Sequence, residues 1–293
     1  PSPVWLGRSP DLRMTPNVTS AQIGYWQGKV ALVTGGSSGL GRSLAEAFSA
    51  GGAAVAIAAR NADALAAAAC GIERAGGRAL AIPADITRQN AVDDMIARTM
   101  DHFGRLDVLV NCAGRSMRRA VVDTTPDDFQ QLMELNFFAL VRCTRAALPH
   151  LLASRGHLVN IGSLAGKAAA RYVGAYPASK FAVTAYTQQL RLELAPRGLH
   201  VLLVCPGPIA RDEPRPTGDR LARGDDLGLP ERAHQPGAGV RARPIRPEKL
   251  AQAILDACRR RQSELIYPRT ARLLFALMQL SPRLADWIIR RTT

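Results

Sequence analysis

Short apolar runs alternate along the chain with longer stretches in which apolar residues recur every three or four positions. The runs predict buried strands at Lys29–Thr34, Ala54–Ala58, Arg78–Pro83, Leu106–Val110, His157–Ile161, His200–Cys205 and Glu264–Tyr267. The stretches predict helices at Leu40–Ala50, Ala62–Ala75, Asn90–Phe103, Pro126–Leu152, Ala175–Leu194 and Pro247–Arg261. The fourth of these helices is expected to bend or end near Pro149, because proline removes a helical hydrogen bond. Repeated strand–helix units predict an α/β fold, a Rossmann-like doubly wound parallel sheet with helices on both faces.

The segments outside this pattern set the expected domain limits. Residues 1–27 contain four prolines and lack periodicity. We expect them to be disordered, and they do not resemble a signal peptide. Residues 28–268 form one NADP-binding catalytic domain, in which the proline- and glycine-rich segment 207–247 is expected to be a substrate loop that closes on ligand. Residues 269–293 form an apolar helical tail that breaks at Ser281–Pro282.

Composition favours a cytoplasmic protein with reduced thiols. The five cysteines are widely spaced and include no C-x-x-C motif, so we expect neither disulfides nor a bound metal. No run of 18 apolar residues predicts a membrane-spanning helix. The formal net charge of +14 comes almost entirely from arginine and has no basic motif with interleaved aromatic residues. We therefore expect no nucleic-acid partner.

A glycine-rich segment follows the first predicted strand and opens the first helix. It reads Gly35, Gly36, Ser37, Ser38, Gly39, Leu40 and Gly41. Glycines at such a turn let backbone N–H groups approach a pyrophosphate, and the helix N-terminus favours the negative charge. A merely flexible loop is the alternative, but the place directly after the first strand favours dinucleotide binding.

The end of the second strand indicates which dinucleotide binds. Many dinucleotide-binding folds place an acid there, which binds the ribose 2′-hydroxyl. This chain has Ala59 followed by Arg60. An arginine pairs with a 2′-phosphate, so the sequence predicts NADP(H) as the cofactor. A solvated surface charge is the alternative role for Arg60.

Tyr176 and Lys180 lie four residues apart at the start of a predicted helix and so share one face. A nearby ammonium stabilises phenolate, which lets a tyrosine act as an acid or base near neutral pH. Such pairs also occur by chance in helices. Here Ser163 follows a predicted strand, where open α/β sheets bind ligands, so the three residues indicate a catalytic site.

Several motifs together resemble the short-chain dehydrogenases/reductases. These are TGGSSGLG at 34–41, NCAG at 111–114, Ser163, YPASK at 176–180 and PG at 206–207. The resemblance covers about residues 28–268 and implies a catalytic tetrad of Asn136, Ser163, Tyr176 and Lys180. It implies that Asn136 holds a water in a proton relay and that Ser163 hydrogen-bonds the substrate oxygen. It also implies that Tyr176 transfers the proton and that Lys180 holds the nicotinamide ribose.

The same resemblance implies a set of cofactor contacts. They are Gly35, Ser37, Ser38, Gly39, Leu40, Gly41, Arg60, Asp85, Ile86, Asn111, Ala113, Gly114, Tyr176, Lys180, Pro206, Gly207 and Ile209. Asp85 and Ile86 would contact the adenine, and Asn111 and Gly114 would support the sheet beside the cofactor.

The chain departs from the family pattern at two places. Cys112 stands where the family's motif usually has a second Asn, a conservative change. Arg211 stands where a Thr usually hydrogen-bonds the carboxamide, so backbone groups of Ile209 are expected to take over that contact. Whether Arg211 reaches the cofactor, the substrate or solvent stays open.

The motifs predict an NADP-dependent oxidoreductase that moves a hydride between the nicotinamide and a ketone, an aldehyde or a secondary alcohol. A binding or regulatory protein on the same fold is one alternative, and an epimerase or dehydratase is another. The tail after Arg269 carries apolar residues with arginines at its edges. This pattern leaves open a peripheral membrane contact, a contact with the chain's own body or with a sister subunit, and a hydrophobic or lipid-like substrate.

We expect a homodimer or a homotetramer. The helices at Pro126–Leu152 and Ala175–Leu194 carry more apolar residues than one core-facing stripe needs. The residues in question are Phe129, Leu132, Met133, Phe137, Leu140, Phe181, Thr184, Ala185 and Gln188. Relatives in the family pair these two helices across a two-fold axis, the commonest symmetry of soluble oligomers.

Overall fold

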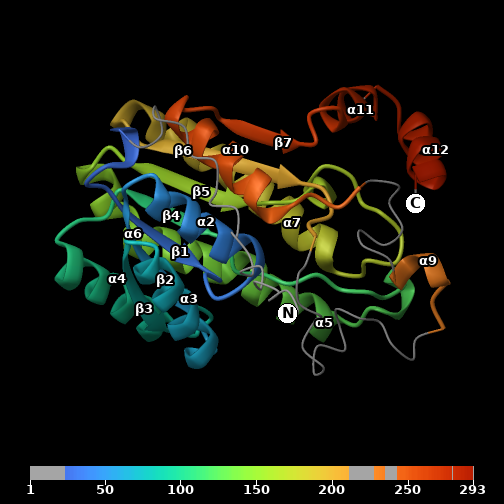
Figure 1. Cartoon of the computed structure of the whole chain (residues 1–293). Coiled ribbons are helices and arrows are strands. Elements are labelled where there is room, and N and C mark those ends of the chain that lie inside the picture. Colours follow the sequence, from blue (N-terminus) through green and yellow to red (C-terminus); the bar gives the residue numbers. More distant parts are fainter. Residues whose placement is uncertain (1–23, 211–227, 235–242, 279, 293) are drawn as a thin grey trace, which may run out of the picture.

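The computed structural model describes residues 24–210, 228–234, 243–278 and 280–292 of the 293-residue chain. Its strands form one parallel sheet in the order β3-β2-β1-β4-β5-β6-β7 (Figure 1). They are β1 (Val30–Thr34), β2 (Ala54–Ala59), β3 (Arg78–Pro83), β4 (Val108–Asn111), β5 (His157–Ile161), β6 (His200–Pro206) and β7 (Glu264–Tyr267). The order reverses between β1 and β4, which is the place where such sheets bind ligands.

Helices cover both faces of the sheet, which confirms the predicted fold class (Figure 1). They are α2 (Gly39–Ala50), α3 (Ala62–Arg74), α4 (Gln89–Phe103), α5 (Pro126–Met133), α6 (Ala139–Ala153), α7 (Tyr176–Leu194), α9 (Glu231–His234), α10 (Pro247–Arg259), α11 (Ala271–Met278) and α12 (Pro282–Thr292). In the part of the chain that the structure describes, no helix has the length and apolar content needed to cross a bilayer.

The central strands are buried on both sides. In β1, Ala31 and Val33 pack in the core cluster with α2, α3 and α10, whereas Leu32 packs with α4 and α6 on the opposite face. Each of these three side chains is completely buried. A strand buried on both faces needs continuous apolar residues, which is why β1 shows no polar alternation.

The long helix expected at Pro126–Leu152 is interrupted in a different place from the one predicted. Pro149 lies inside α6, which continues to Ala153. The break comes earlier, where a π-helical turn, η2 (Glu134–Phe138), separates α5 from α6. Such turns are often found at functional sites, and η2 carries Asn136.

The boundary expected after residue 27 is also wrong. Residues 24–26 are helical, and Trp26 is completely buried. Its ring lies edge-on against Phe48 of α2, with the ring centroids 4.9 Å apart. Burial of so large an apolar side chain makes this short segment part of the core. Residues 1–23 lie outside the described residues.

The expected substrate loop is only partly within the described residues. Its first residues pair with its last: Ile245 donates a backbone hydrogen bond to Pro208, and Ala210 donates one back to Ile245, each at 2.8 Å. Residues 211–227 and 235–242, including Arg211, lie outside the described residues. The tail forms α11 and α12 with the predicted break between them, and it extends beyond the end of β7 (Figure 1).

Candidate active site

The glycine-rich turn between β1 and α2 has the shape that a pyrophosphate site requires. A Cβ atom on Gly41 would lie 2.1 Å from the Gly35 carbonyl oxygen, and one on Gly36 would lie 2.7 Å from Cβ of Ile57. Neither position tolerates a side chain without movement of its surroundings. The side chain of Ser38 does not cap α2, and the first turn of α2 has no acidic residue. The helix N-terminus can therefore receive an anionic group.

Two charged residues stand at the adenine side of the expected cofactor site. Arg60 follows β2 and is exposed. Asp85 follows β3 and accepts hydrogen bonds from the backbone N–H and the hydroxyl of Thr87, at 3.1 and 2.8 Å. Burial alone would raise the pKa of Asp85, but these bonds and the nearby Arg60 hold it below its usual value. Ile86 is buried beside them.

Thr34 joins the glycine-rich turn to the NCAG segment, a role that its sequence position did not reveal. Its hydroxyl accepts hydrogen bonds from the backbone N–H groups of Cys112 and Ala113, at 3.0 and 3.2 Å, and donates one to the Val110 carbonyl. The two loops that flank the switch point are therefore held together by one buried side chain. Burial raises the pKa of the Cys112 thiol to about 12, so it is a neutral thiol.

Asn111 belongs to a buried polar chain that crosses the sheet face. Its amide donates to Thr144 at 3.1 Å and to Asn160 at 2.9 Å, and Asn160 donates in turn to Thr187 at 3.0 Å. These bonds tie β4 and β5 to helices α6 and α7. Asn111 thus fixes the positions of these strands, and its side chain is buried.

Asn136 connects the π-helical turn to the loop after β4. Its side chain accepts a hydrogen bond from the N–H of Arg115 and donates one to the Arg115 carbonyl, both at 2.9 Å. It also donates to the Ser179 hydroxyl at 3.0 Å. A Cβ atom on Gly114 would lie 2.9 Å from Oδ1 of Asn136, so glycine is needed for this close approach. Arg115 and Ser179 had no role in the sequence analysis.

Tyr176 and Lys180 lie beside each other at the carboxyl end of β5, and Ser163 follows the last residue of that strand by two positions. Nζ of Lys180 lies 5.8 Å from the ring centroid of Tyr176 and donates a hydrogen bond to the Ile161 carbonyl at 2.8 Å. Burial lowers the pKa of Lys180 to about 8. The Ser163 hydroxyl accepts a bond from the backbone N–H of Ala165, which leaves its own hydrogen for another partner.

The PG turn is held against the end of the last strand. The N–H of Gly207 donates to the carbonyl oxygen of Tyr267 at 2.8 Å. Ile209 lies opposite Ile245, but the two hydrogen bonds of this pairing use the neighbouring residues Pro208 and Ala210. The backbone groups of Ile209 therefore point away from Ile245, and the expected contact with the carboxamide stays a prediction.

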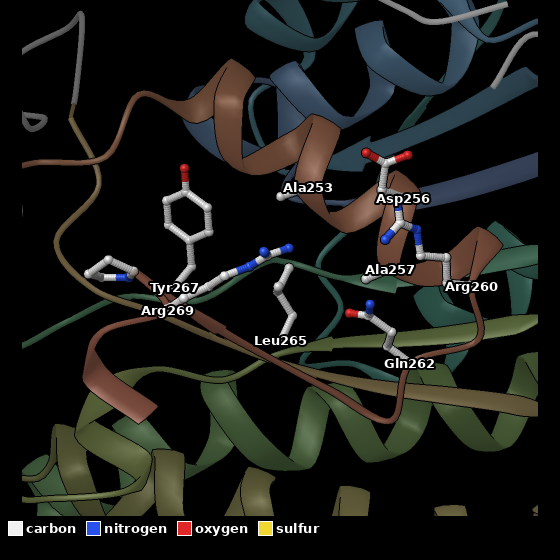
Figure 2. A pocket seen from close by; sticks show the side chains of 9 residues that line it. Ala253, Asp256, Ala257, Arg260, Gln262, Leu265, Tyr267 and Arg269 are labelled. Atoms are coloured by element: carbon white, nitrogen blue, oxygen red, sulfur yellow. The ribbon is translucent and has the colours of Figure 1, made fainter. Parts of the chain in front are cut away.

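Two other features lie apart from this constellation. A pocket of about 400 Å³ between α10 and β7 is lined in part by Asp256, Arg260 and Tyr267, and by none of the four expected catalytic residues (Figure 2). Among the described residues, the potential metal ligands that come together are His157, His200 and Cys258. The two histidines are the first residues of β5 and β6. They lie at the amino ends of these strands, whereas the expected catalytic residues lie at the carboxyl ends.

Comparisons with known proteins identify the family of the chain. The family model "short chain dehydrogenase" matches residues 29–218. The chain belongs to the short-chain dehydrogenase/reductase family. Family membership makes it an NAD(P)-dependent dehydrogenase or reductase that acts on CH–OH or C=O groups, and it has the Rossmann-like fold of its structural neighbours.

Individual relatives differ in what they act on. A fatty acyl-CoA reductase of Acinetobacter baylyi is 40% identical over 171 residues, which are 57% of this chain and 58% of that protein. The ketoacyl reductase HetN of a Nostoc species is 30% identical over 90% of this chain and 88% of its own length. A short-chain dehydrogenase of Burkholderia cenocepacia, solved in complex with NADP, is 32% identical, with a TM-score of 0.68 over 82% of this chain and 96% of that one.

Proposed function

We propose that this protein is an NADP(H)-dependent oxidoreductase that transfers a hydride between the nicotinamide and a ketone, an aldehyde or a secondary alcohol of hydrophobic character. The observation that carries the proposal is the placing of Tyr176 beside the buried Lys180. NADP(H) supplies or accepts the hydride when bound. The residues that would hold it are those of the glycine-rich turn, Arg60, Asp85 and Lys180.

The protein's own groups would handle the proton and the orientation of substrate. In the reductive direction, the hydroxyl of Ser163 donates a hydrogen bond to the carbonyl oxygen, and the hydroxyl of Tyr176 donates its proton to that oxygen. The ammonium of Lys180 stabilises the phenolate that remains. Asn136 fixes the loop after β4, whose Gly114 lies against both Asn136 and Lys180.

The activity is tested by measuring NADPH oxidation with a panel of ketones and aldehydes of increasing chain length. Tyr176→Phe keeps the ring and removes the proton donor, so turnover should fall by about 100-fold or more while NADPH still binds. Near-normal turnover in this variant would overturn the assignment. No NADPH oxidation with any carbonyl, together with tight NADPH binding, would instead support a binding protein on this fold.

The choice of NADP(H) over NAD(H) rests on Arg60. The guanidinium stands close enough to Asp85 to lower the pKa of that carboxyl, so it lies at the adenine side of the site. A charge-assisted contact with a 2′-phosphate contributes about 1–3 kcal/mol. Arg60→Ala should therefore weaken NADPH binding by about tenfold or more and leave NADH binding unchanged. Equal affinity of the unmodified protein for the two cofactors would contradict this choice.

The proposal includes a homodimer formed through α7 and the η2 region. Three of the residues expected at this interface, Leu132, Leu140 and Thr184, are buried in the protomer's own core and are not available. The outer face of α7 remains: its exposed residues include Phe181, Ala185, Gln188 and Leu192, at helical spacing. Phe138 of η2 is also exposed. Pairing of two copies would cover these apolar side chains.

A further inference from the structure

The two tail helices leave an apolar surface uncovered at one end of the molecule. On α11 and just after it, Leu273, Leu277 and Leu280 are 69%, 42% and 75% exposed. Leu273 and Leu277 are four residues apart and so share one side of α11, and Leu280 follows the end of that helix. On α12, Trp287 is 52% exposed. We name this surface, Leu273, Leu277, Leu280 and Trp287, the tail face.

Each tail helix also has an inner side that holds it in place. Met278 of α11 and Ile288 of α12 are both only 8% exposed. The side chain of Trp287 lies under the guanidinium of Arg291, whose Cζ is 4.3 Å from the centre of its ring. The exposed leucines and Trp287 are therefore presented outward by helices that already bury their other side.

The charge around the tail face is strongly positive. Residues 269–291 contain five arginines and a single acid, Asp286. Arg272 and Arg283 are exposed, and so are Arg290 and Arg291. Leucine and tryptophan rimmed by arginine are suited to the lipid–water interface, where the ring lies at the headgroups and the guanidinium groups reach the phosphates.

We propose that the tail face docks on an anionic membrane surface. Charge decides between this partner and a second copy of the chain. A symmetric pair would bring two sets of arginines together with one acid on each side, and like charges across an interface are strongly unfavourable. An anionic leaflet attracts the same arginines, because its surface potential is negative.

The position of the tail relates this surface to the active site. The tail starts directly after β7, and the carbonyl of the last β7 residue, Tyr267, accepts the hydrogen bond from Gly207 of the PG turn. Ser163 follows the carboxyl end of β5, the PG turn that of β6 and the tail that of β7, so all three leave the sheet at the same ends of its parallel strands. Docking would bring the carboxyl ends of these strands close to the membrane. If the proposed reductase activity is correct, the substrate class is a carbonyl carried on a membrane-embedded acyl chain.

Vesicle binding tests the docking without any dependence on catalysis. The full chain is mixed with vesicles of phosphatidylcholine alone, or of phosphatidylcholine with phosphatidylglycerol, and separated by flotation. We expect binding to the anionic vesicles, little binding to the neutral ones, and release as salt is raised. Leu273→Ser with Trp287→Ala, and separately Arg283→Gln with Arg290→Gln, should each weaken binding by about tenfold or more.

A matched control replaces an exposed apolar residue elsewhere. Val122 is 88% exposed on the turn before α5, and Val122→Ser should bind vesicles as the unmodified chain does. Thermal unfolding of each variant reports whether it is folded. Failure of the folded, unmodified chain to bind either vesicle would overturn the docking. So would a change of oligomeric mass in Leu273→Ser with Trp287→Ala, since it would show that a second copy covers the tail face.

Reduction of a short, water-soluble ketone separates this proposal from the proposed activity. The tail variants should reduce such a ketone at the unmodified rate and lose rate only with a vesicle-borne carbonyl. Vesicle binding by a protein that reduces no carbonyl would leave the docking intact and refute the activity. Reduction of the soluble ketone without vesicle binding would support the activity and refute the docking.

Discussion

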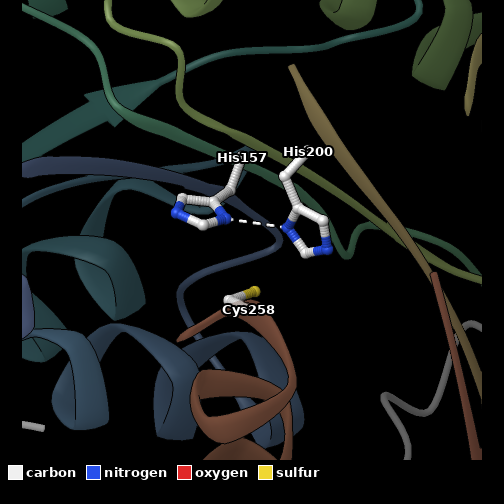
Figure 3. Close-up of side chains that lie close together, drawn as sticks. All are labelled: His157, His200 and Cys258. Carbon is white, nitrogen blue, oxygen red and sulfur yellow. Dashed lines mark hydrogen bonds between the residues drawn. The ribbon is translucent and has the colours of Figure 1, made fainter. Parts of the chain in front are cut away.

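The Nδ1 atoms of His157 and His200 lie 2.8 Å apart in the core at the amino ends of β5 and β6 (Figure 3). The outer nitrogen of each ring is also bonded. Nε2 of His200 donates to the Gln262 carbonyl at 2.8 Å, and Nε2 of His157 lies 2.9 Å from the Tyr25 hydroxyl. Because the carbonyl can only accept, the bonds run in one direction if both rings are neutral: Tyr25 to His157, His157 to His200, His200 to Gln262.

This chain of bonds makes stability depend on pH. Burial lowers the pKa of His157 to about 3 and that of His200 to about 4, and the positive charges of Arg261 and Lys29 add to the effect at His157. Below pH ~6.5 the unfolded chain binds protons at both histidines and the folded chain does not. As the pH is lowered from ~6.5 to ~4, the free energy of unfolding should therefore decrease. The decrease is up to about 1.4 kcal/mol per pH unit for each histidine.

Denaturant unfolding at pH 7 and pH 5 measures this loss. His157→Gln removes one of the two titrating groups, so its stability should change less between the two pH values than that of the unmodified protein. His102→Gln changes an exposed histidine at the end of α4 and should leave the pH dependence as it is. An unchanged pH dependence in His157→Gln would show that other groups cause the acid loss.

Lys180 should set the alkaline limb of the activity. With its pKa lowered to about 8, the ammonium of the free enzyme loses its charge at mildly alkaline pH. We expect kcat/KM for NADPH to decline above pH ~8, since this parameter reports on the free enzyme. Arginine keeps its charge, so Lys180→Arg should move any remaining alkaline limb upward. A limb at the same pH in Lys180→Arg would assign it to another group.

Asn136 should act chiefly by holding the loop after β4. Asn136→Ala leaves the N–H and carbonyl of Arg115 without their partner, at a cost of about 1–3 kcal/mol in the free energy of unfolding, and lowers turnover. Ser179→Ala removes the acceptor of the Asn136 amide and the donor to the Tyr176 carbonyl, and should cost about 1–2 kcal/mol. Its kcat should fall by less than tenfold, with KM for NADPH unchanged. Wild-type kcat and stability in Asn136→Ala would refute this role.

The parts of the site that the sequence predicted depend on local requirements. Gly36 and Gly41 are needed because a Cβ atom would collide with neighbouring atoms, and the four-residue interval of Tyr176 and Lys180 alone places them on one helix face. Both requirements appear as short motifs of neighbouring residues in the sequence. They can be recognised without knowledge of the tertiary fold.

The contacts that the sequence did not reveal join distant residues. Asn136 and Ser179 are 43 positions apart, and Thr34 and Ala113 are 79 apart. No spacing rule connects such pairs. The π-helical turn was missed because apolar residues continue through it at helical intervals, whereas Pro149, which does carry a local signal, is accommodated within α6.

Trp26 should contribute strongly to stability although it precedes the first strand. Its ring fills the space beside Gly51, where a Cβ atom would lie 3.0 Å from Cδ1 of the indole. Trp26→Ala should lower the free energy of unfolding by about 3–5 kcal/mol and leave the affinity for NADPH unchanged. Trp26→Phe should cost less, because the indole N–H has no hydrogen-bond partner to lose. Denaturant unfolding compares the two variants, and equal costs would contradict this packing.

The outer face of α7 should carry the dimer. Phe181 is 45% exposed and Phe138 is 44% exposed. Phe138 lies close to α7, because its neighbour Phe137 packs edge-on against Tyr186 of that helix. A carboxylate at either position would be buried without a partner in a dimer and would be solvated in a monomer. Phe181→Asp with Phe138→Asp should therefore shift the mass measured by light scattering from a dimer toward the single-chain value of 31.4 kDa. Val122→Asp, at a more exposed site outside both helices, should remain a dimer. A single-chain mass for the unmodified protein at micromolar concentration would refute the dimer, and a dimer that survives both Phe substitutions would place its interface elsewhere.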